Sequence, residues 1–98
     1  MGISLDVIKE RTSQIAKDYD IDKIYLFGSY ARGDADDSSD IDLLISSDKM
    51  DILSMSRLKQ QLMDSLETMV DVISETAVSN VFRFLIKDDE ILIYEKSR

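Results

Sequence analysis

Apolar residues recur along this chain with two spacings, three to four residues apart in some segments and in short unbroken or alternating runs in others. The first spacing is typical of one face of an α-helix, and the second is typical of a β-strand. The pattern predicts helices over residues 4–19, 51–66 and 78–86, and strands over residues 23–27, 41–46, 69–74 and 91–94. Strands separated by helices favour an α/β fold, in which helices flank a small mixed β-sheet.

The helical stripes also predict which side chains are buried. In the first helix the stripe consists of Leu5, Ile8, Thr12, Ile15, Ala16 and Tyr19. In the helix over 51–66 it consists of Ile52, Met55, Leu58, Leu62, Met63 and Leu66. In the last helix it consists of Val78, Val81, Phe82, Leu85 and Ile86. We therefore expect these side chains to face a common core.

The segment over residues 28–40, GSYARGDADDSSD, interrupts this pattern. It holds two of the three glycines of the chain and a cluster of small polar residues, so we expect a loop after at most one helical turn. A loop of about a dozen residues in so small a domain is more often functional than idle. We therefore expect this loop to carry the chemistry of the chain.

Composition removes several classes of function. The 98 residues are enough for a single domain, which we expect to span 1–98, and 12 Lys+Arg against 20 Asp+Glu give a net charge of −8. That balance argues against direct nucleic-acid binding, because such proteins need positive charge for the phosphates. Histidine and cysteine are both absent, which excludes disulfide scaffolds, zinc fingers, Ser-His-Asp triads and cysteine nucleophiles.

No apolar run approaches the ~20 residues that span a bilayer. The first residues, MGISLDVIKERTSQ, lack the basic and apolar regions of a signal peptide. We therefore expect a cytoplasmic protein with no membrane association.

Three aspartates are placed for chemistry. Asp40 and Asp42 project from the same face of the strand over 41–46, about 6 to 7 Å apart, a spacing at which carboxylates can share hard cations. Asp71 lies inside an otherwise apolar strand, where an unpaired carboxylate is unfavourable. If the two strands pair, Asp71 completes a three-carboxylate site that binds Mg²⁺ incompletely and leaves positions for water and phosphate oxygens.

The residues at the start of the loop suit a phosphate group. Gly28 directly follows a strand, so the backbone can come close to a phosphate, to which the next amides and the Ser29 hydroxyl can donate. Arg32 is the only cation of the loop, and it either neutralises triphosphate charge or pairs with a loop aspartate. The Walker A and GxGxxG patterns are both absent, so neither a P-loop nor a Rossmann site is predicted.

Simpler interpretations of the aspartates remain. Asp40 and Asp42 can belong to an acidic turn that leads into a strand, and Asp71 can be a solvent-facing position on an edge strand. An EF-hand calcium loop fits poorly, because the position of its glycine is Ser39 and that of its bidentate glutamate is Ile45.

The motif resembles that of a known family. Gly28-Ser29, ten intervening residues and Asp40-Ile41-Asp42 are similar to the signature of the nucleotidyltransferase superfamily related to DNA polymerase beta. The wider stretch GSYARGDADDSSDIDLLI resembles the minimal nucleotidyltransferases (MNT proteins) that prokaryotes encode beside HEPN-domain proteins. The resemblance covers nearly the whole chain, including the VDVI segment in which the family carries its third carboxylate.

The resemblance implies a fold, an activity and a partner. By this resemblance, the metal-binding aspartates of the family correspond to Asp40, Asp42 and Asp71, and its nucleotide-phosphate turn corresponds to Gly28 and Ser29. It implies transfer of AMP from ATP with two Mg²⁺ ions, typically to a tyrosine of a HEPN toxin, which makes the MNT protein the antitoxin. With no histidine available, Asp71 is our candidate for the general base. We expect the partner to bring the acceptor, and any oligomer to form through it.

Two other functions stay open. The chain could neutralise a toxin by binding alone, without catalysis. It could also transfer the nucleotide to a small cation such as an aminoglycoside, which the acidic surface would attract.

Overall fold

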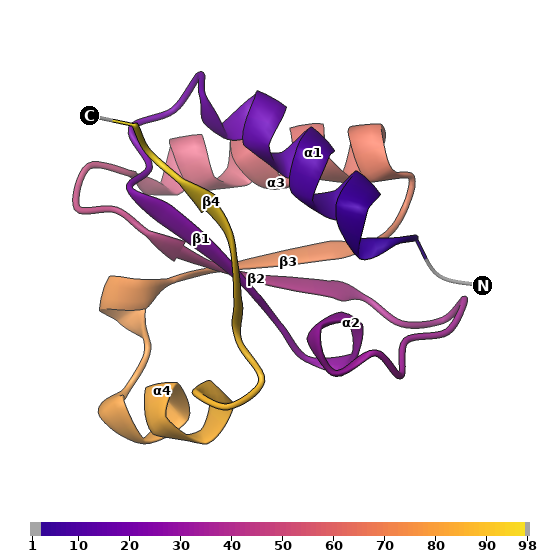
Figure 1. The fold of residues 1–98 in the computed structure, drawn as a ribbon. Helices are drawn as coiled ribbons and strands as arrows, with labels where there is room; N and C mark the ends of the chain where they lie inside the picture. The colour runs from indigo at the N-terminus through magenta and orange to yellow at the C-terminus, as the bar shows by residue number, and fades with distance from the viewer. Residues whose placement is uncertain (1–2, 98) are drawn as a thin grey trace.

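Each predicted strand and helix is present in the computed structural model, which describes residues 3–97 (Figure 1). A short helix, α2, opens the predicted loop, and a 3-10 helix, η1, follows the third strand. In chain order the elements are α1 (Leu5–Ala16), β1 (Lys23–Phe27), α2 (Ser29–Arg32), β2 (Ile41–Ser46), α3 (Ile52–Leu66), β3 (Val70–Ser74), η1 (Glu75–Ala77), α4 (Asn80–Ile86) and β4 (Ile91–Glu95).

The four strands form one mixed sheet in the order β3-β2-β1-β4. The strand β1 is antiparallel to both of its neighbours, whereas β2 and β3 are parallel. Parallel neighbours need a crossover connection, and the chain makes it through α3. The expected α/β architecture with a small mixed sheet is therefore confirmed.

The hydrophobic core lies between one face of the sheet and the helices α1 and α3, which lie side by side on that face (Figure 1). Alternate residues of each strand point toward it, as Ile41, Leu43 and Ile45 do from β2. The helices contribute buried side chains at helical spacing, among them Leu58, Leu62 and Leu66 of α3.

The opposite face of the sheet is covered differently. The short helix α4 lies on this side, whereas α2 lies at the end of β1, with Tyr30 and Ala31 packed against the core (Figure 1). Phe82 of α4 packs edge-on against Phe27 of β1, with ring centroids 5.7 Å apart and planes at 84°. Arg83 lies 4.8 Å from the centre of the Tyr25 ring, a cation–π distance. This face carries the candidate site.

The predicted stripes are wrong at several helix positions. Val81 and Leu85 are exposed (69% each), and Val78 precedes α4, which begins after the Ser79 cap. Phe82, Arg83 and Ile86 form the less exposed side of α4, and Leu85 and Val81 lie about 105° and 145° around the helix from the centre of that side. A sequence stripe several residues wide cannot show which of its edges is buried.

One helix boundary and one more core position differ from the prediction. The first helix ends at Ala16 rather than at residue 19, although Tyr19 still reaches α3, where its hydroxyl donates to Gln61. Ile52, predicted as core, is 87% exposed in the first turn of α3, about 80° around the helix from the centre of the buried leucines.

Among residues 3–97, no helix combines the length and apolar character that crossing a membrane requires.

Candidate functional site

The turn between β1 and α2 brings the backbone against a carboxylate. Gly28 has φ 78° and ψ −156°, a conformation open to glycine, and its carbonyl accepts from the amides of Ala31 and Arg32 at 3.1 Å. A Cβ atom at Gly28 would lie 2.5 Å from Oδ2 of Asp42, closer than any real contact. The dihedral angles therefore favour glycine, and any larger residue would also have to displace the Asp42 carboxylate.

Asp42 and Asp71 are neighbours across parallel strands. The register pairs Asp42 with Asp71 between β2 and β3, and it pairs Asp42 with Phe27 between β2 and β1. Both carboxylates point away from the face covered by α1 and α3, because Val70 and Val72 pack against the core on that face. The pairing of these strands, on which the proposed three-carboxylate site depends, is present.

The three candidate carboxylates differ in exposure. Asp42 is half-buried, whereas Asp40, just before β2, and Asp71 are exposed. Asp40 is held near the edge of the sheet, because the next amide, that of Ile41, donates to the carbonyl of Met69 at 2.9 Å. Within residues 3–97, no group of three or more acidic side chains is already gathered as a metal site.

The electrostatic environment is least favourable at Asp42. Burial raises the pKa of Asp42 above its ordinary value, the negative charges of Asp71 and Asp40 raise it further, and the charge of Arg32 opposes them. The negative charge of ionised Asp42 is therefore only partly compensated by its surroundings. Carboxylate oxygens are the ligands that Mg²⁺ prefers, so the donor chemistry of this face fits that ion.

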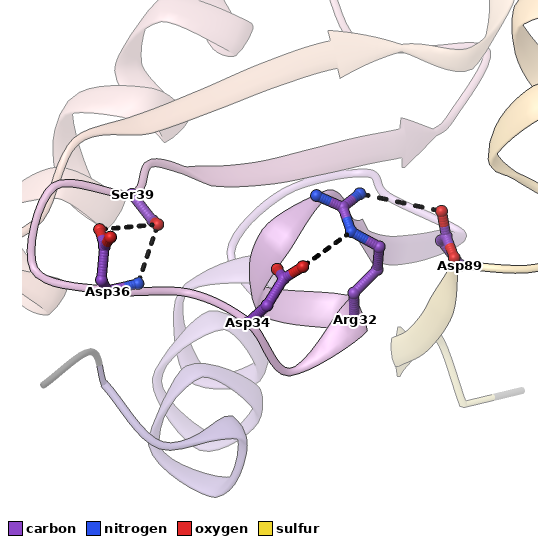
Figure 2. A network of polar contacts seen from close by, with 5 residues as sticks. All are labelled: Arg32, Asp34, Asp36, Ser39 and Asp89. Atoms are coloured by element: carbon purple, nitrogen blue, oxygen red, sulfur yellow. Dashed lines mark hydrogen bonds and ion pairs between the residues drawn. The ribbon is translucent and has the colours of Figure 1, made fainter.

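Arg32 is engaged with acidic side chains of two segments (Figure 2). Its Nε lies 3.4 Å from Oδ2 of Asp34, and its Nη1 lies 3.8 Å from Oδ2 of Asp89, in the turn between α4 and β4. Of the two roles that the sequence left open for Arg32, the structure shows the pairing with a loop aspartate. The contact with Asp89 links α2 to the other end of the chain, which no local pattern predicts.

The rest of the loop is organised around Asp36 (Figure 2). Its Oδ1 accepts from the amide of Ser38 at 2.9 Å and from the Ser38 hydroxyl at 2.7 Å. Its own amide donates to the Ser39 hydroxyl at 2.9 Å. The Ser38 hydroxyl and amide, with the Ser39 hydroxyl, lower the pKa of Asp36, so this carboxylate shapes the loop.

Asp71 has a partner that sequence reasoning missed. Nζ of Lys59, on α3, lies 3.8 Å from Oδ1 of Asp71. The two residues lie on different elements, and only the packing of α3 beside β3 brings them together.

Replacement of Gly28 tests the contact with Asp42. We expect Gly28→Ala to lower the free energy of unfolding by about 1–3 kcal/mol, because alanine must both adopt a positive φ and displace the Asp42 carboxylate. Urea unfolding followed by circular dichroism measures the change.

Gly33 provides the matched control for that substitution. It also has a positive φ, 83°, but an added Cβ would meet nothing within 4 Å. Gly33→Ala should therefore cost only about 1 kcal/mol. In an Asp42→Ala background the cost of Gly28→Ala should fall toward that of Gly33→Ala. Equal costs at the two glycines in the native background would contradict the close approach.

The raised pKa of Asp42 predicts a pH-dependent stability. Above that pKa the ionised carboxylate destabilises the fold, and below the unfolded value of about 3.9 the effect is lost. In EDTA at pH 7, Asp42→Asn should therefore raise the free energy of unfolding by up to about 1 kcal/mol, and the gain should shrink as the pH falls through the pKa of Asp42. The exposed Asp48→Asn is the control, and a less stable Asp42→Asn chain at pH 7 would contradict the repulsion.

Two toxin–antitoxin complexes share this fold. One, solved with AMP-PNP, superimposes with a TM-score of 0.79 over 90% of this chain and 73% of the matched chain, at 24% identity. The other contains the tri-AMPylated HEPN toxin of Shewanella oneidensis with an MNT antitoxin, and it gives a TM-score of 0.73 at 21% identity, over 93% and 72% of the two chains. At these identities the likeness establishes the fold.

Sequence comparison places the chain in a family. The probable protein adenylyltransferase MntA of Haemophilus influenzae is 33% identical over 96 residues, which are 96% of this chain and 82% of the relative. The family model described as polymerase beta, nucleotidyltransferase, matches residues 10–98. That match includes the turn at Gly28 and all three candidate carboxylates. The chain therefore belongs to the polymerase beta-like nucleotidyltransferase family of enzymes, as its resemblance to the minimal nucleotidyltransferases predicted.

Proposed function

We propose that this chain is a Mg²⁺-dependent adenylyltransferase that transfers AMP from ATP to a tyrosine of a HEPN-domain protein and thereby acts as an antitoxin. The observation that carries the proposal is the arrangement of Gly28, Asp42 and Asp71, in which a glycine turn touches one carboxylate and a second lies beside it in register. A close backbone approach next to paired carboxylates suits a metal-bound phosphate group.

Asp40, Asp42 and Asp71 are the residues that would hold two Mg²⁺ ions. When bound, these ions supply charge neutralisation to the triphosphate and the acceptor oxygen. The Ser29 hydroxyl and the amides after Gly28 would donate to phosphate oxygens. Arg32, 47% exposed and held by two long contacts, can exchange an aspartate for a phosphate.

The reaction is an in-line displacement at the α-phosphorus. The acceptor hydroxyl oxygen forms a bond to that phosphorus, and the bond from the α-phosphorus to the oxygen bridging it to the β-phosphate breaks, releasing pyrophosphate. The hydroxyl proton needs a base, and in a chain without histidine a carboxylate is the available group. The exposed Asp71 is our candidate, because it can face an acceptor from solution.

The choice of partner is supported by the relatives. The matched complexes are toxin–antitoxin assemblies, and one of them contains a HEPN toxin that carries AMP groups. We therefore assign a HEPN protein as the acceptor, ATP as the donor, and no direct role to nucleic acid or membrane. Any oligomer would form through the partner.

The transfer itself is the test. With labelled ATP, Mg²⁺ and the HEPN protein proposed as its partner, the chain should label that protein on tyrosine, as mass spectrometry of the product can show. Asp42→Asn should reduce the rate by at least about 100-fold, because it removes a metal ligand while keeping the side-chain shape. Asp48→Asn, which replaces an exposed aspartate outside the site, should leave the rate unchanged.

The other functions give different results in the same system. A binding-only antitoxin would form the complex without labelling, and the chain with both Asp40→Asn and Asp42→Asn would still protect cells from the toxin. An aminoglycoside-modifying enzyme would label kanamycin and leave the HEPN protein unlabelled. Either result, with the fold intact, would overturn the proposal.

A further inference from the structure

Asp71, the third carboxylate of the candidate site, forms an ion pair with a lysine that lies outside the site. Asp71 lies on β3, an edge strand of the described sheet, and its side chain is 55% exposed. Its ion-pair partner, Lys59, is on α3, which covers the core face of the sheet (Figure 1). The Asp71 side chain points to the other face. The contact between Nζ and Oδ1, at 3.8 Å, therefore reaches around the edge of β3.

The position of Lys59 is fixed by its neighbour in the chain. Leu58 is fully buried in the core, and Leu62, one turn later, is fully buried as well. The backbone that carries Lys59 is thus anchored, while its own side chain remains 40% exposed and able to move. The ammonium group can therefore move, whereas the backbone that carries it is fixed.

The pairing singles out Asp71 among the candidate ligands. Among the ion pairs between described residues, the one with Lys59 is the only one that includes Asp40, Asp42 or Asp71. The same residues contain no preassembled group of three acidic ligands, although Asp42 and Asp71 are neighbours in register. A metal ion that used Asp71 as a ligand would therefore have to replace the Lys59 ammonium group as its partner.

We infer that Lys59 is a positioning residue for Asp71: it holds this carboxylate at the edge of β3 when no metal ion is bound and gives it up to Mg²⁺. The inference rests on the proposed function, in which Asp71 is a metal ligand. Exchange is easy because an exposed ion pair is weak, whereas a divalent ion is attracted by several carboxylates at once. Lys59 also limits the repulsion that Asp71 exerts on Asp42 while the metal is absent.

Metal binding, measured apart from catalysis, tests the inference. Mn²⁺ serves as the probe in place of Mg²⁺, and the electron paramagnetic resonance signal of free Mn²⁺ gives the dissociation constant. Lys59→Met removes the competing charge, so the chain should bind Mn²⁺ about threefold to tenfold more tightly. Lys59→Arg, which keeps the charge, should bind as the native chain does.

Two controls separate this effect from a general change of charge. Lys9→Met removes the same charge from an exposed position on α1 and should leave the affinity within about twofold of the native value. In an Asp71→Asn background, Lys59→Met should no longer change the affinity. Thermal unfolding of each variant confirms that the chain is folded, and Lys59→Gln repeats the test if Lys59→Met is not.

The outcomes distinguish the inference from the proposed function. If the native chain binds Mn²⁺ and Lys59→Met binds it equally well or more weakly, Lys59 does not compete for Asp71, and the proposed function is unaffected. An effect of Lys59→Met that persists without the Asp71 carboxylate would also overturn the inference. If the native chain binds no Mn²⁺, with or without ATP, the proposed metal site and the inference both fail.

Discussion

The close approach of the Gly28 backbone to the Asp42 carboxylate is the constraint on which the candidate site depends. The end of β1 and the start of β2 are neighbours in the sheet, so the turn after β1 must pass over the side chain that β2 presents there. A Cβ atom at Gly28 would displace the Asp42 carboxylate. The same contact brings the backbone of the turn and a carboxylate to one place, a combination that suits a metal-bound phosphate.

Charge is the second constraint, and it acts against the metal-free fold. The parallel register that sets Asp71 beside Asp42 also makes the two anions repel each other, and burial of Asp42 increases the effect. Two cations on separate elements offset part of this repulsion. Arg32 opposes the negative charge near Asp42, and Lys59 pairs with Asp71. Both cations make exposed, long contacts. Such contacts are weak enough to be exchanged when a stronger ligand arrives.

The sequence predicted most of the fold because its strands are short β-branched runs and its helices carry clear apolar stripes. The strands over 23–27 and 41–46 have the predicted bounds. The pairing of the strands that carry Asp42 and Asp71 was only a condition of the predicted site, and the structure shows that it is present and parallel. The predicted core is wrong at Leu5, the first residue of α1, which is exposed. It is also wrong at Ile52, Val81 and Leu85, where a stripe was too wide to orient a helix. The ion pairs of Lys59 and Asp89 were missed because each joins elements that meet only in the folded chain.

The central claim is that nucleotide and metal bind over the turn at Gly28 and the carboxylate of Asp42. Backbone amide chemical shifts, recorded by ¹H–¹⁵N NMR while Mg²⁺ and AMP-PNP are added together, test it most directly. The account predicts the largest changes at Gly28, Ser29 and the residues flanking Asp42 and Asp71. Large changes confined to the loop around Asp36, or to the cavity lined by Asp18 and Lys49 at another part of the surface, would contradict it.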